Sequence, residues 1–500
     1  MKNHIHQILF ISTIIIMALL SVQTFTSFIP LKPLNGVIVN SPMPALTFQN
    51  YTNGTFQEDF EKFGKDHFGF REWLIPLYNQ CNYDLFKKTE HDGFFICKDN
   101  WLFWGEMLQD QYESLTFKHV SNAEEMAEIF EKDAKTLYYL QEVLKEYGTT
   151  LFVCIAPSKN ELYPEYLPEN NLFYRKGGIH ADEFYVKRFQ ELGINYLDLN
   201  TLYKSLKGKV DYPLFYKTSS HYSHISATYA ADTLVKFMEE KSKLNIQNFN
   251  FGKPYVDKPK KIDRDLEMLF NLIRPIEHID YYYVDIEPIP DSTAVKPRWL
   301  TIGDSFYWNI SEKAREAGIF GSTPFWYYNK EVYNDDGSDF YAENHNIADE
   351  LLEADIVMIL WCPINLYELE HNFVDKALLS LCGEESVNNI VANIKNSPEW
   401  YNAIVEQAKQ QNKNVEEMIQ LNVEWVIKNN IEKYFNMDDI QIPESRNQRI
   451  APLGKYFKGQ SPENICKIKH VYRDLKKQNA NADDEALLKE AVERLGLAEK

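Results

Sequence analysis

The feature that most constrains the fold is an alternation of strand-like and helix-like segments between residues 121 and 385. Short apolar runs that suit buried strands are separated by longer segments with apolar residues at helical spacing. Strands that alternate with helices predict a largely parallel sheet covered by helices on both faces. Functional side chains in such a sheet gather at the carboxyl ends of the strands. The strand-like runs are TTLFVCIAP (149–157), INYLDL (194–199), RWLTIGDS (298–305) and EADIVMILWCP (353–363).

The sequence pattern divides the chain into four regions, and the first of these is residues 1–30. Residues 31–120 are predicted to contain a linker, helices and a hairpin, and residues 121–385 the α/β domain. Beyond this domain helix start signals dominate, such as Ser397 followed by proline and Asn414 followed by a glutamate-rich turn. We therefore expect residues 386–500 to form a helical C-terminal region that packs on the core.

The first thirty residues have the composition of a membrane or export signal. No Lys, Arg, Asp or Glu occurs between Lys2 and Lys32, and Ile8–Val22 is apolar apart from small hydroxyl residues. This fits a signal anchor or a signal peptide. The segment has no A-x-A-like cleavage site and no lipobox cysteine, which favours an uncleaved anchor. We expect a single-pass protein of the cell membrane whose remainder is extracytoplasmic or periplasmic.

Composition argues against several functions. The chain of 500 residues has a formal net charge of −20, whereas nucleic-acid binding needs clustered Lys and Arg to neutralise phosphates. Aromatic residues make up 14% of the chain; such rings usually fill cores, although they also stack on sugar faces. The six cysteines form no C-x-x-C pair, and no metal-ligand spacing stands out. We expect no metal ion, no cofactor and no nucleic-acid partner.

Two short motifs contain the residue types of a nucleophilic site. The GDSF motif (303–306) ends a predicted buried strand, where a serine hydroxyl is exposed and backbone N–H groups can face a developing oxyanion. A serine needs a general base, and His221 and His224 of YKTSSHYSH (216–224) are the candidates. Each motif is short, and a lone histidine is more often structural than catalytic.

Five segments occur in the order found in a known family. They are DHFGFREWLI, KDNWLFWGE, PSKNELYPEYLP, YKTSSHYSH and GDSF, which lie between about residues 50 and 385. This order resembles the alginate O-acetyltransferase-like branch of the SGNH hydrolase superfamily, also called the DHHW family. The resemblance implies an SGNH-like α/β fold, with a mostly parallel sheet flanked by helices. In this branch the Asp and His of the catalytic triad precede the Ser.

The resemblance assigns roles to individual residues. Ser305 is the nucleophile and His221 is its base. The family's T-D-x-H-W box aligns with TSSHY, which places Ser219 at the position of the acid and Tyr222 at that of the Trp. The predicted site therefore lacks the usual Asp, whose loss costs a serine triad about 10⁴-fold in rate. The Ser219 hydroxyl, a backbone carbonyl or a remote carboxylate such as Asp211 is left to orient His221.

Three further residues are candidates for contacts to the substrate or the oxyanion. Asn365 follows the strand-like run 353–363, where the family carries an Asn-containing loop, and is either an oxyanion donor or a turn former. Asp304 either faces the site or pins the turn through its own carboxylate. Tyr222 stands next to the predicted base.

The predicted function is O-acetyl transfer to a secreted or cell-surface polysaccharide through Ser305 and His221. Two alternatives stay open: a catalytically inactive glycan-binding or assembly subunit, which the missing acid favours, and a carbohydrate acetylesterase. The implied partners are a polysaccharide acceptor and an acetyl donor delivered by a multi-pass membrane acyltransferase. On this interpretation Ser219→Asp would restore the acid and raise activity.

Overall fold

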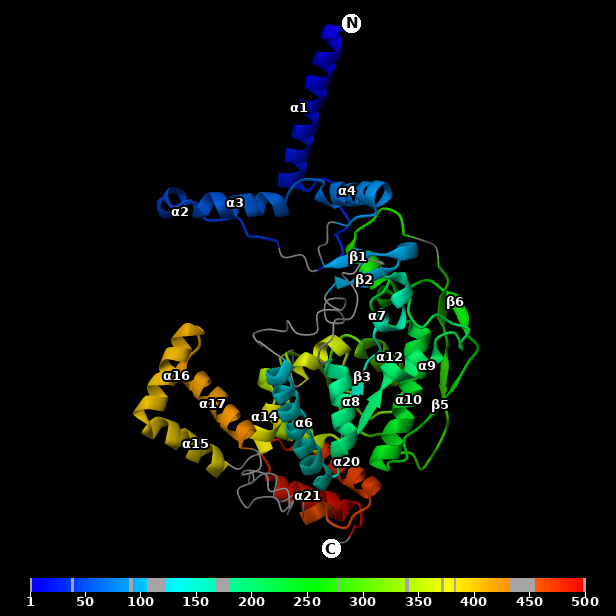
Figure 1. The fold of residues 1–500 in the computed structure, drawn as a ribbon, viewed down its shortest axis with the longest axis vertical. Coiled ribbons are helices and arrows are strands. Elements are labelled where there is room, and N and C mark those ends of the chain that lie inside the picture. The colour runs from blue at the N-terminus through cyan, green and yellow to red at the C-terminus, as the bar shows by residue number, and fades with distance from the viewer. Residues whose placement is uncertain are drawn as a thin grey trace.

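The computed structural model shows an α/β body with a long N-terminal helix that projects from one end (Figure 1). The described residues are 2–36, 40–89, 93–105, 123–167, 180–276, 279–337, 341–369, 373–381, 384–430 and 455–497.

A six-stranded sheet forms the centre of the body. Its strands run in the order β11 (Glu331–Tyr333), β10 (Phe325–Tyr327), β9 (Trp299–Gly303), β12 (Ile356–Trp361), β3 (Thr150–Ile155) and β4 (Tyr196–Asp198). Neighbouring strands are parallel except β10 and β11, which are antiparallel. All four strands expected from apolar runs are present, and the predicted α/β fold is confirmed.

Alternate residues of the strands face two different hydrophobic layers. Leu151 and Val153 of β3 belong to the layer formed with α6 (Ala123–Glu146), α8 (Ala181–Leu192) and α14 (Phe373–Leu381). Phe152 and Cys154 belong to the layer formed with α9 (Leu199–Leu206), α10 (His224–Ser242) and α12 (Tyr307–Ala317). Both faces of the sheet are therefore covered, as a parallel sheet requires.

The described part of the C-terminal region is helical, as predicted. It consists of α15 (Glu384–Asn396), α16 (Pro398–Gln410), α17 (Val415–Asn429), α20 (Pro462–Gln478) and α21 (Asp484–Arg494). The side chains of Ser397 and Asn414 cap α16 and α17. On α20, Nζ of the buried Lys469 donates to Oγ1 of Thr149 and to the carbonyl oxygen of Ala354, both at 2.8 Å, which ties this helix to the ends of the sheet strands.

The N-terminal elements lie at one end of the body (Figure 1). They are α1 (Lys2–Thr26), α2 (Phe48–Thr52), α3 (Thr55–Asp66) and α4 (Arg71–Phe86), followed by the predicted hairpin of β1 (Phe94–Ile96), η1 (Lys98–Asn100) and β2 (Leu102–Trp104). Within α1, the segment Ile5–Thr26 is long and apolar enough to cross a membrane. Membrane anchors and signal sequences both have such a segment.

Between α10 and β9 the sequence pattern predicts no elements, but the structure forms two small antiparallel sheets. β5 (Phe249–Phe251) pairs with β8 (Ile286–Pro288), and β6 (Tyr255–Asp257) pairs with β7 (Tyr281–Tyr283). Two short helices, η4 (Lys261–Arg264) and α11 (Asp265–Leu269), lie between β6 and β7. We call residues 249–288 the insertion. The remaining short helices are α7 (Lys159–Leu162), η2 (Pro164–Tyr166), η5 (Ala342–Asn344), α13 (Ile347–Glu353) and η6 (Pro363–Glu368).

Candidate active site

A sharp turn between β9 and α12 carries Ser305. Gly303 leaves no room for a side chain, because a Cβ atom there would lie 2.6 Å from a backbone carbonyl oxygen of β12. The Asp304 carboxylate accepts hydrogen bonds from the backbone N–H groups of Phe306 at 3.0 Å and Cys362 at 2.7 Å. Asp304 thus pins the turn, and Ser305 stays partly exposed at the carboxyl end of the sheet.

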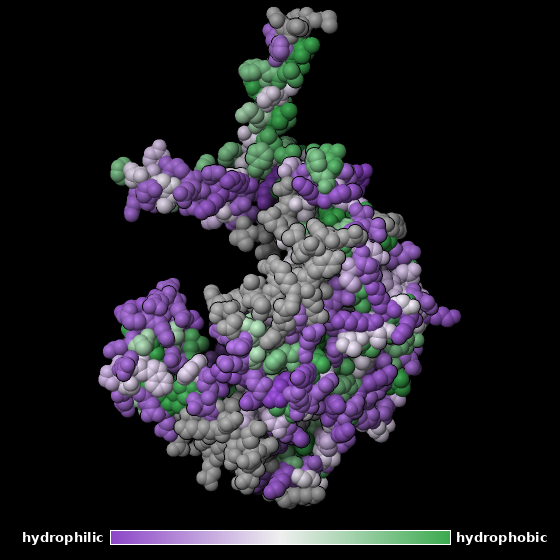
Figure 2. Space-filling model, viewed as in Figure 1, coloured by the Kyte–Doolittle hydropathy of each residue, from purple (hydrophilic) through white to green (hydrophobic). Residues whose placement is uncertain are grey.

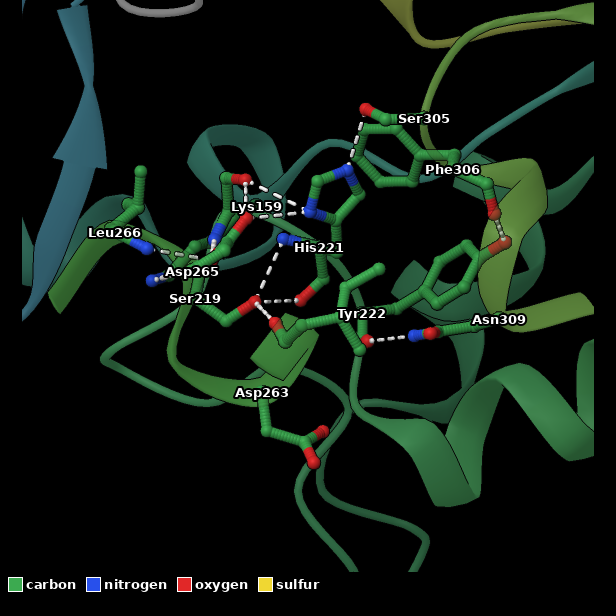
Figure 3. Close-up of polar contacts among 12 residues, drawn as sticks. Lys159, Ser219, His221, Tyr222, Asp263, Asp265, Leu266, Ser305, Phe306 and Asn309 are labelled. Atoms are coloured by element: carbon green, nitrogen blue, oxygen red, sulfur yellow. Dashed lines mark hydrogen bonds and ion pairs between the residues drawn. The ribbon is translucent and has the colours of Figure 1, made fainter. Parts of the chain in front are cut away.

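His221 reaches Ser305 from the loop that precedes α10. Its Nε2 atom lies 2.7 Å from Oγ of Ser305 (Figure 3). The ring of Phe306 packs against the imidazole with 4.7 Å between ring centroids, which limits the orientations open to the base. His224, the other candidate base, lies on α10 with its Nε2 atom 2.9 Å from Nζ of Lys260. The structure therefore brings His221, and not His224, to the serine.

The second imidazole nitrogen of His221 meets a carboxylate. Nδ1 lies 2.6 Å from Oδ2 of Asp265, the first residue of α11 in the insertion (Figure 3). Ser220 holds the same carboxylate, because its backbone N–H donates to Oδ1 at 2.8 Å and its hydroxyl donates to Oδ2. Ser305, His221 and Asp265 form a continuous chain of hydrogen bonds, which has the geometry of a serine triad.

The structure therefore places a carboxylate beside His221, where the sequence predicted the acid to be missing at Ser219 and left a remote carboxylate open. Asp265 lies 44 residues beyond His221, on a segment whose path the sequence pattern did not indicate. Asp211 is an exposed residue and not the remote carboxylate. Ser219 does not orient the ring: its hydroxyl accepts the backbone N–H of His221 at 3.0 Å and donates to the carbonyl oxygen of Ile262 at 2.7 Å.

Further hydrogen bonds attach the insertion to the loop that carries His221. Thr218 donates through its hydroxyl to the carbonyl oxygen of Asp263 at 3.0 Å, and its own carbonyl oxygen accepts the N–H of Glu267 at 3.2 Å. Together with the bond from Ser219 to Ile262, these contacts fix the two segments side by side. The position of Asp265 opposite the imidazole is thus set by its neighbours as well as by its own side chain.

The surroundings of Asp265 keep its carboxyl group ionised at neutral pH. Burial acts to raise its pKa, but the charge interaction with His221 and the hydrogen bonds from His221 and Ser220 outweigh burial, so that the pKa lies below its ordinary value of 3.8. An ionised carboxylate accepts the proton on Nδ1 of His221. That tautomer leaves Nε2 free to accept the proton of the Ser305 hydroxyl.

The buried Lys159 forms hydrogen bonds to the loop that carries His221. Nζ of Lys159 donates to the carbonyl oxygens of Leu102 at 2.8 Å, Lys217 at 3.1 Å and Ser219 at 2.6 Å. Burial lowers the pKa of Lys159 to about 7, while the negative charge of Asp265 acts to raise it. An ammonium group has three protons, so the three carbonyl partners match its charged form. Lys159 thus connects Leu102 of the β1–β2 hairpin to Lys217 and Ser219, which lie on either side of Thr218 in the loop before His221.

The remaining predicted site residues lie around this core. Tyr222 is fully buried, and its hydroxyl donates to the carbonyl oxygen of Phe306, so that it supports the serine turn from inside. Asn365 directs its amide nitrogen to Oδ2 of Asp304 at 2.9 Å and to the Tyr328 hydroxyl at 3.3 Å. In the structure both residues form hydrogen bonds to residues of the turn that carries Ser305.

No group of three or more His, Cys, Asp or Glu side chains that would suit a metal ion occurs among the described residues. Cys81, Cys97, Cys154 and Cys466 are free thiols in the structure. The sequence allowed two disulfide pairings. The pairing of Cys81 with Cys97 is not formed in the structure. The pairing of Cys382 with Cys466 involves Cys382, which lies outside the described residues.

We expect Lys159→Met to destabilise the protein by about 2–4 kcal/mol, because three carbonyl oxygens, in two buried hydrogen bonds and one partly buried one, lose their donor. Chemical denaturation followed by circular dichroism measures the change. Lys236→Met, at a residue whose side chain is 64% exposed, is the matched control and should change the stability little. Equal stability of the two variants would contradict the role assigned to Lys159.

The low pKa of Asp265 gives a pH-dependent prediction. A carboxyl group whose pKa is lower in the folded state than in the unfolded chain stabilises the folded state above its unfolded pKa, and this contribution is lost as the pH falls through the folded value. Asp265→Asn should therefore lower the free energy of unfolding at pH 7 by about 1–3 kcal/mol. The difference from the wild type should shrink below about pH 4. A difference that is constant from pH 7 to pH 3 would contradict the ionised state of Asp265.

Comparison with known proteins gives matches to one group of acetyltransferases. Residues 95–283 match the family described as "SGNH hydrolase-like domain, acetyltransferase AlgX". The chain is 25% identical over 197 residues to the "Probable alginate O-acetylase AlgJ" of Pseudomonas syringae pv. tomato, which covers 38% of this chain and 45% of the relative. The AlgJ protein of Pseudomonas aeruginosa is 25% identical over 199 residues, covering 40% of this chain and 46% of the relative. The chain thus spans less than half the length of the curated relatives it matches.

Solved structures are also similar to this chain. The O-acetyltransferase domain of Pseudomonas putida AlgJ shares 17% sequence identity over 55% of this chain and 92% of that domain, with a TM-score of 0.37. Bacillus cereus PatB1 shares 13% identity over 55% of this chain and 96% of its own, with a TM-score of 0.33. The family match over residues 95–283 includes His221 and Asp265 and ends before Ser305. It confirms the resemblance drawn from the sequence motifs: this chain carries a segment similar to the SGNH hydrolase-like domain of AlgX-type acetyltransferases.

Proposed function

We propose that the chain transfers acetyl groups to a polysaccharide, with Ser305 as nucleophile, His221 as general base and Asp265 as the residue that orients the base. One observation carries the proposal: the hydrogen bonds that connect Oγ of Ser305 through the imidazole to the carboxylate, at 2.7 Å and 2.6 Å. The similarity to proteins named as alginate O-acetylases supports acetyl as the transferred group and an alginate-like polysaccharide as the acceptor.

In the first half of the reaction, Nε2 of His221 takes the proton of the Ser305 hydroxyl as Oγ attacks the carbonyl carbon of the acetyl donor. The bond from the carbonyl carbon to the leaving group then breaks, and His221 returns its proton to that group. The product is an acetyl ester on Ser305. Asp265 accepts the Nδ1 proton throughout, and its negative charge stabilises the imidazolium while the proton is held there.

In the second half, a sugar hydroxyl replaces the leaving group. His221 removes its proton as the sugar oxygen attacks the acetyl carbon, and the proton then returns to Oγ of Ser305. The chemistry of the two halves is the same, so one base serves both. Water in place of the sugar would give an esterase, and the acceptor alone separates these two activities.

The turn also offers a donor for the negative charge that develops on the acetyl oxygen. Among the described residues, the backbone N–H of Ser305, which stands just before the first turn of α12, donates no hydrogen bond. The N–H of Phe306 is already bound to Asp304. We assign the Ser305 N–H as an oxyanion donor and give Asn365 a bracing role through Asp304, in place of the oxyanion contact considered from its sequence position.

The proposal includes the cellular setting expected from the sequence. The helix at Ile5–Thr26 would hold the chain on the membrane as a single span, with the catalytic body in the extracytoplasmic or periplasmic space. A multi-pass membrane acyltransferase would deliver the acetyl donor. The inactive-subunit alternative rested on a missing acid, and the contact between Asp265 and His221 removes that argument.

Acyl-enzyme trapping tests the proposed nucleophile. Incubation with an activated acetyl ester should add the mass of one acetyl group to the wild-type chain and none to Ser305→Ala, as read by intact mass spectrometry. If the protein is a transferase, an alginate-type acceptor should speed the loss of the acetyl group and become acetylated. Loss at the same rate with and without the acceptor would indicate an esterase, and no adduct on a folded wild type would refute the catalytic proposal.

Asp265→Asn should slow acetylation of Ser305 by about 10²–10⁴-fold, because an amide does not stabilise the imidazolium and favours the other tautomer. Stopped-flow measurement with the same ester gives the rate. Asp211→Asn is the matched control, since Asp211 is exposed and outside the site, and it should react like the wild type. Similar rates for all three proteins would show that Asp265 does not assist the base.

Ser219→Asp distinguishes a site whose acid is Asp265 from a site that lacks its acid at position 219. The Ser219 side chain is fully buried and faces the carbonyl oxygen of Ile262, so an additional carboxylate there would be repelled by that oxygen and would stand close to Asp265. We expect the substitution to lower both activity and stability. A gain in activity in the same ester assay would instead support a site that lacks its acid.

A further inference from the structure

The helix α4 has mainly polar residues against the protein and mainly apolar residues outward, the reverse of an ordinary surface helix. The exposed Asp84, paired with Arg274, is a charged residue on its outward side. On the polar face, Nδ2 of Asn79 donates to the carbonyl oxygen of Phe270 at 2.7 Å, and Oε1 of Gln80 accepts the N–H of Arg274 at 2.9 Å. Tyr83, also on this face, donates to Oδ1 of Asn100 at 3.0 Å. The outward apolar residues, between 42% and 73% exposed, are Trp73, Leu74, Leu77, Tyr78, Leu85 and Phe86.

The neighbouring helix α3 carries an aromatic row. Phe56, Phe60 and Phe63 stack in sequence, with ring centroids 5.6 Å and 6.3 Å apart, and His67 continues the row. The remaining face of α3 has charges of both signs, at Glu58, Asp59, Glu61, Lys62 and Lys65. Such a face attracts neither strongly anionic nor strongly cationic surfaces, so any binding through this helix must come from its rings.

The end of α1 is joined to the corner between α3 and α4. The N–H of Gly69 donates to Oγ1 of Thr24 at 2.8 Å, and a Cβ atom at Gly69 would lie 2.2 Å from the carbonyl oxygen of Leu20. The rings of Phe28 and Phe70 meet edge to face at 6.1 Å. Figure 1 shows α3 and α4 extending to opposite sides of the base of α1. A membrane crossed by α1 would therefore have its surface at the level of these two helices.

We propose that α3 and α4 lie flat in the surface of a phospholipid bilayer, with the apolar face of α4 inserted among the lipid headgroups. Trp, Tyr and Phe are the side chains that favour this zone, because each ring is apolar with a polarisable face or a polar edge. Figure 2 shows hydrophobic side chains along α1 and over α4, next to a largely hydrophilic body. The exposed face is continuous with the membrane-crossing helix, and this favours lipid over a protein as its occupant.

The contact would also fix how the catalytic body stands on the membrane. The polar face of α4 binds residues 270–274, which directly follow α11, the helix that begins with Asp265. Helix α4 thus packs on the insertion that supplies the acid. This consequence for catalysis rests on the proposed function, whereas the lipid contact does not.

Cys81 gives a native position for a probe, because it is exposed on α4 among the outward apolar residues. The full chain is spin-labelled and placed in phosphatidylcholine vesicles. It carries Cys97→Ser and Cys382→Ser, so that apart from Cys81 its described cysteines are buried and do not react with the label. Electron paramagnetic resonance then measures collisions of the label with oxygen, which enters lipid, and with a nickel chelate, which stays in water. A label at Lys236→Cys, in a chain that also carries Cys81→Ser, is the aqueous control.

We expect the Cys81 label to be several-fold less accessible to nickel than the Lys236 label, at a depth of about 5–10 Å below the phosphates. The result should not change in 1 M salt, because the contact is apolar. Leu77→Glu with Leu85→Glu should return the label to water while α1 stays inserted, and Asp59→Lys on the charged face of α3 should not. Circular dichroism confirms that each variant is folded, and acetyl trapping is measured on the same samples.

Equal nickel accessibility of the two labels would overturn the proposal. Protection that appears only when a multi-pass membrane protein from the same membrane is added would also overturn it, in favour of a protein partner on this face. Failure of acetyl trapping in every variant, with the Cys81 label still in lipid, would refute the proposed catalysis and leave the membrane contact standing.

Discussion

The contact between His221 and Asp265 is the interaction on which the candidate site depends. It joins three segments that are distant in the chain: the loop before α10, the insertion and, through the serine, the turn after β9. Burying a carboxylate is unfavourable unless its oxygens are bonded, and here the imidazole and both hydrogen-bond donors of Ser220 satisfy them. The geometry of the base is therefore inseparable from the folding of the insertion onto the loop.

The parts of this arrangement that were predictable from the sequence are those with a local cause. An apolar run that ends in Gly303 identifies a buried strand and the turn after it, and capping residues such as Ser397 mark helix starts. The GDSF motif at the end of a predicted strand indicated Ser305, and the resemblance to a known family selected His221 over His224. The same reasoning placed Asp304 in the turn that it pins.

The acid was missed because its position has no local cause. The strands of the insertion are only three residues long (FNF, YVD, YYY and IEP), so neither a period of two nor a helical period indicates its path. The stretch KKIDRDLEMLF did contain one signal, since aspartates ahead of an apolar run are typical of a helix start. That signal predicts α11, but only the three-dimensional path shows that its first residue faces His221.

The identity of residue 219 and the position of α11 depend on each other physically. Only one carboxylate fits beside Nδ1 of His221, and a chain segment on either side of the imidazole can supply it. With serine at 219, the carbonyl oxygen of Ile262 approaches to 2.7 Å, and the following residues bring Asp265 to the ring. An aspartate at 219 would hold this backbone away and weaken the contacts between Thr218 and the insertion. The same insertion carries residues 270 and 274, which α4 contacts. The small side chain at 219 lets the insertion pack against the loop of His221, so the insertion contacts both α4 and the catalytic base.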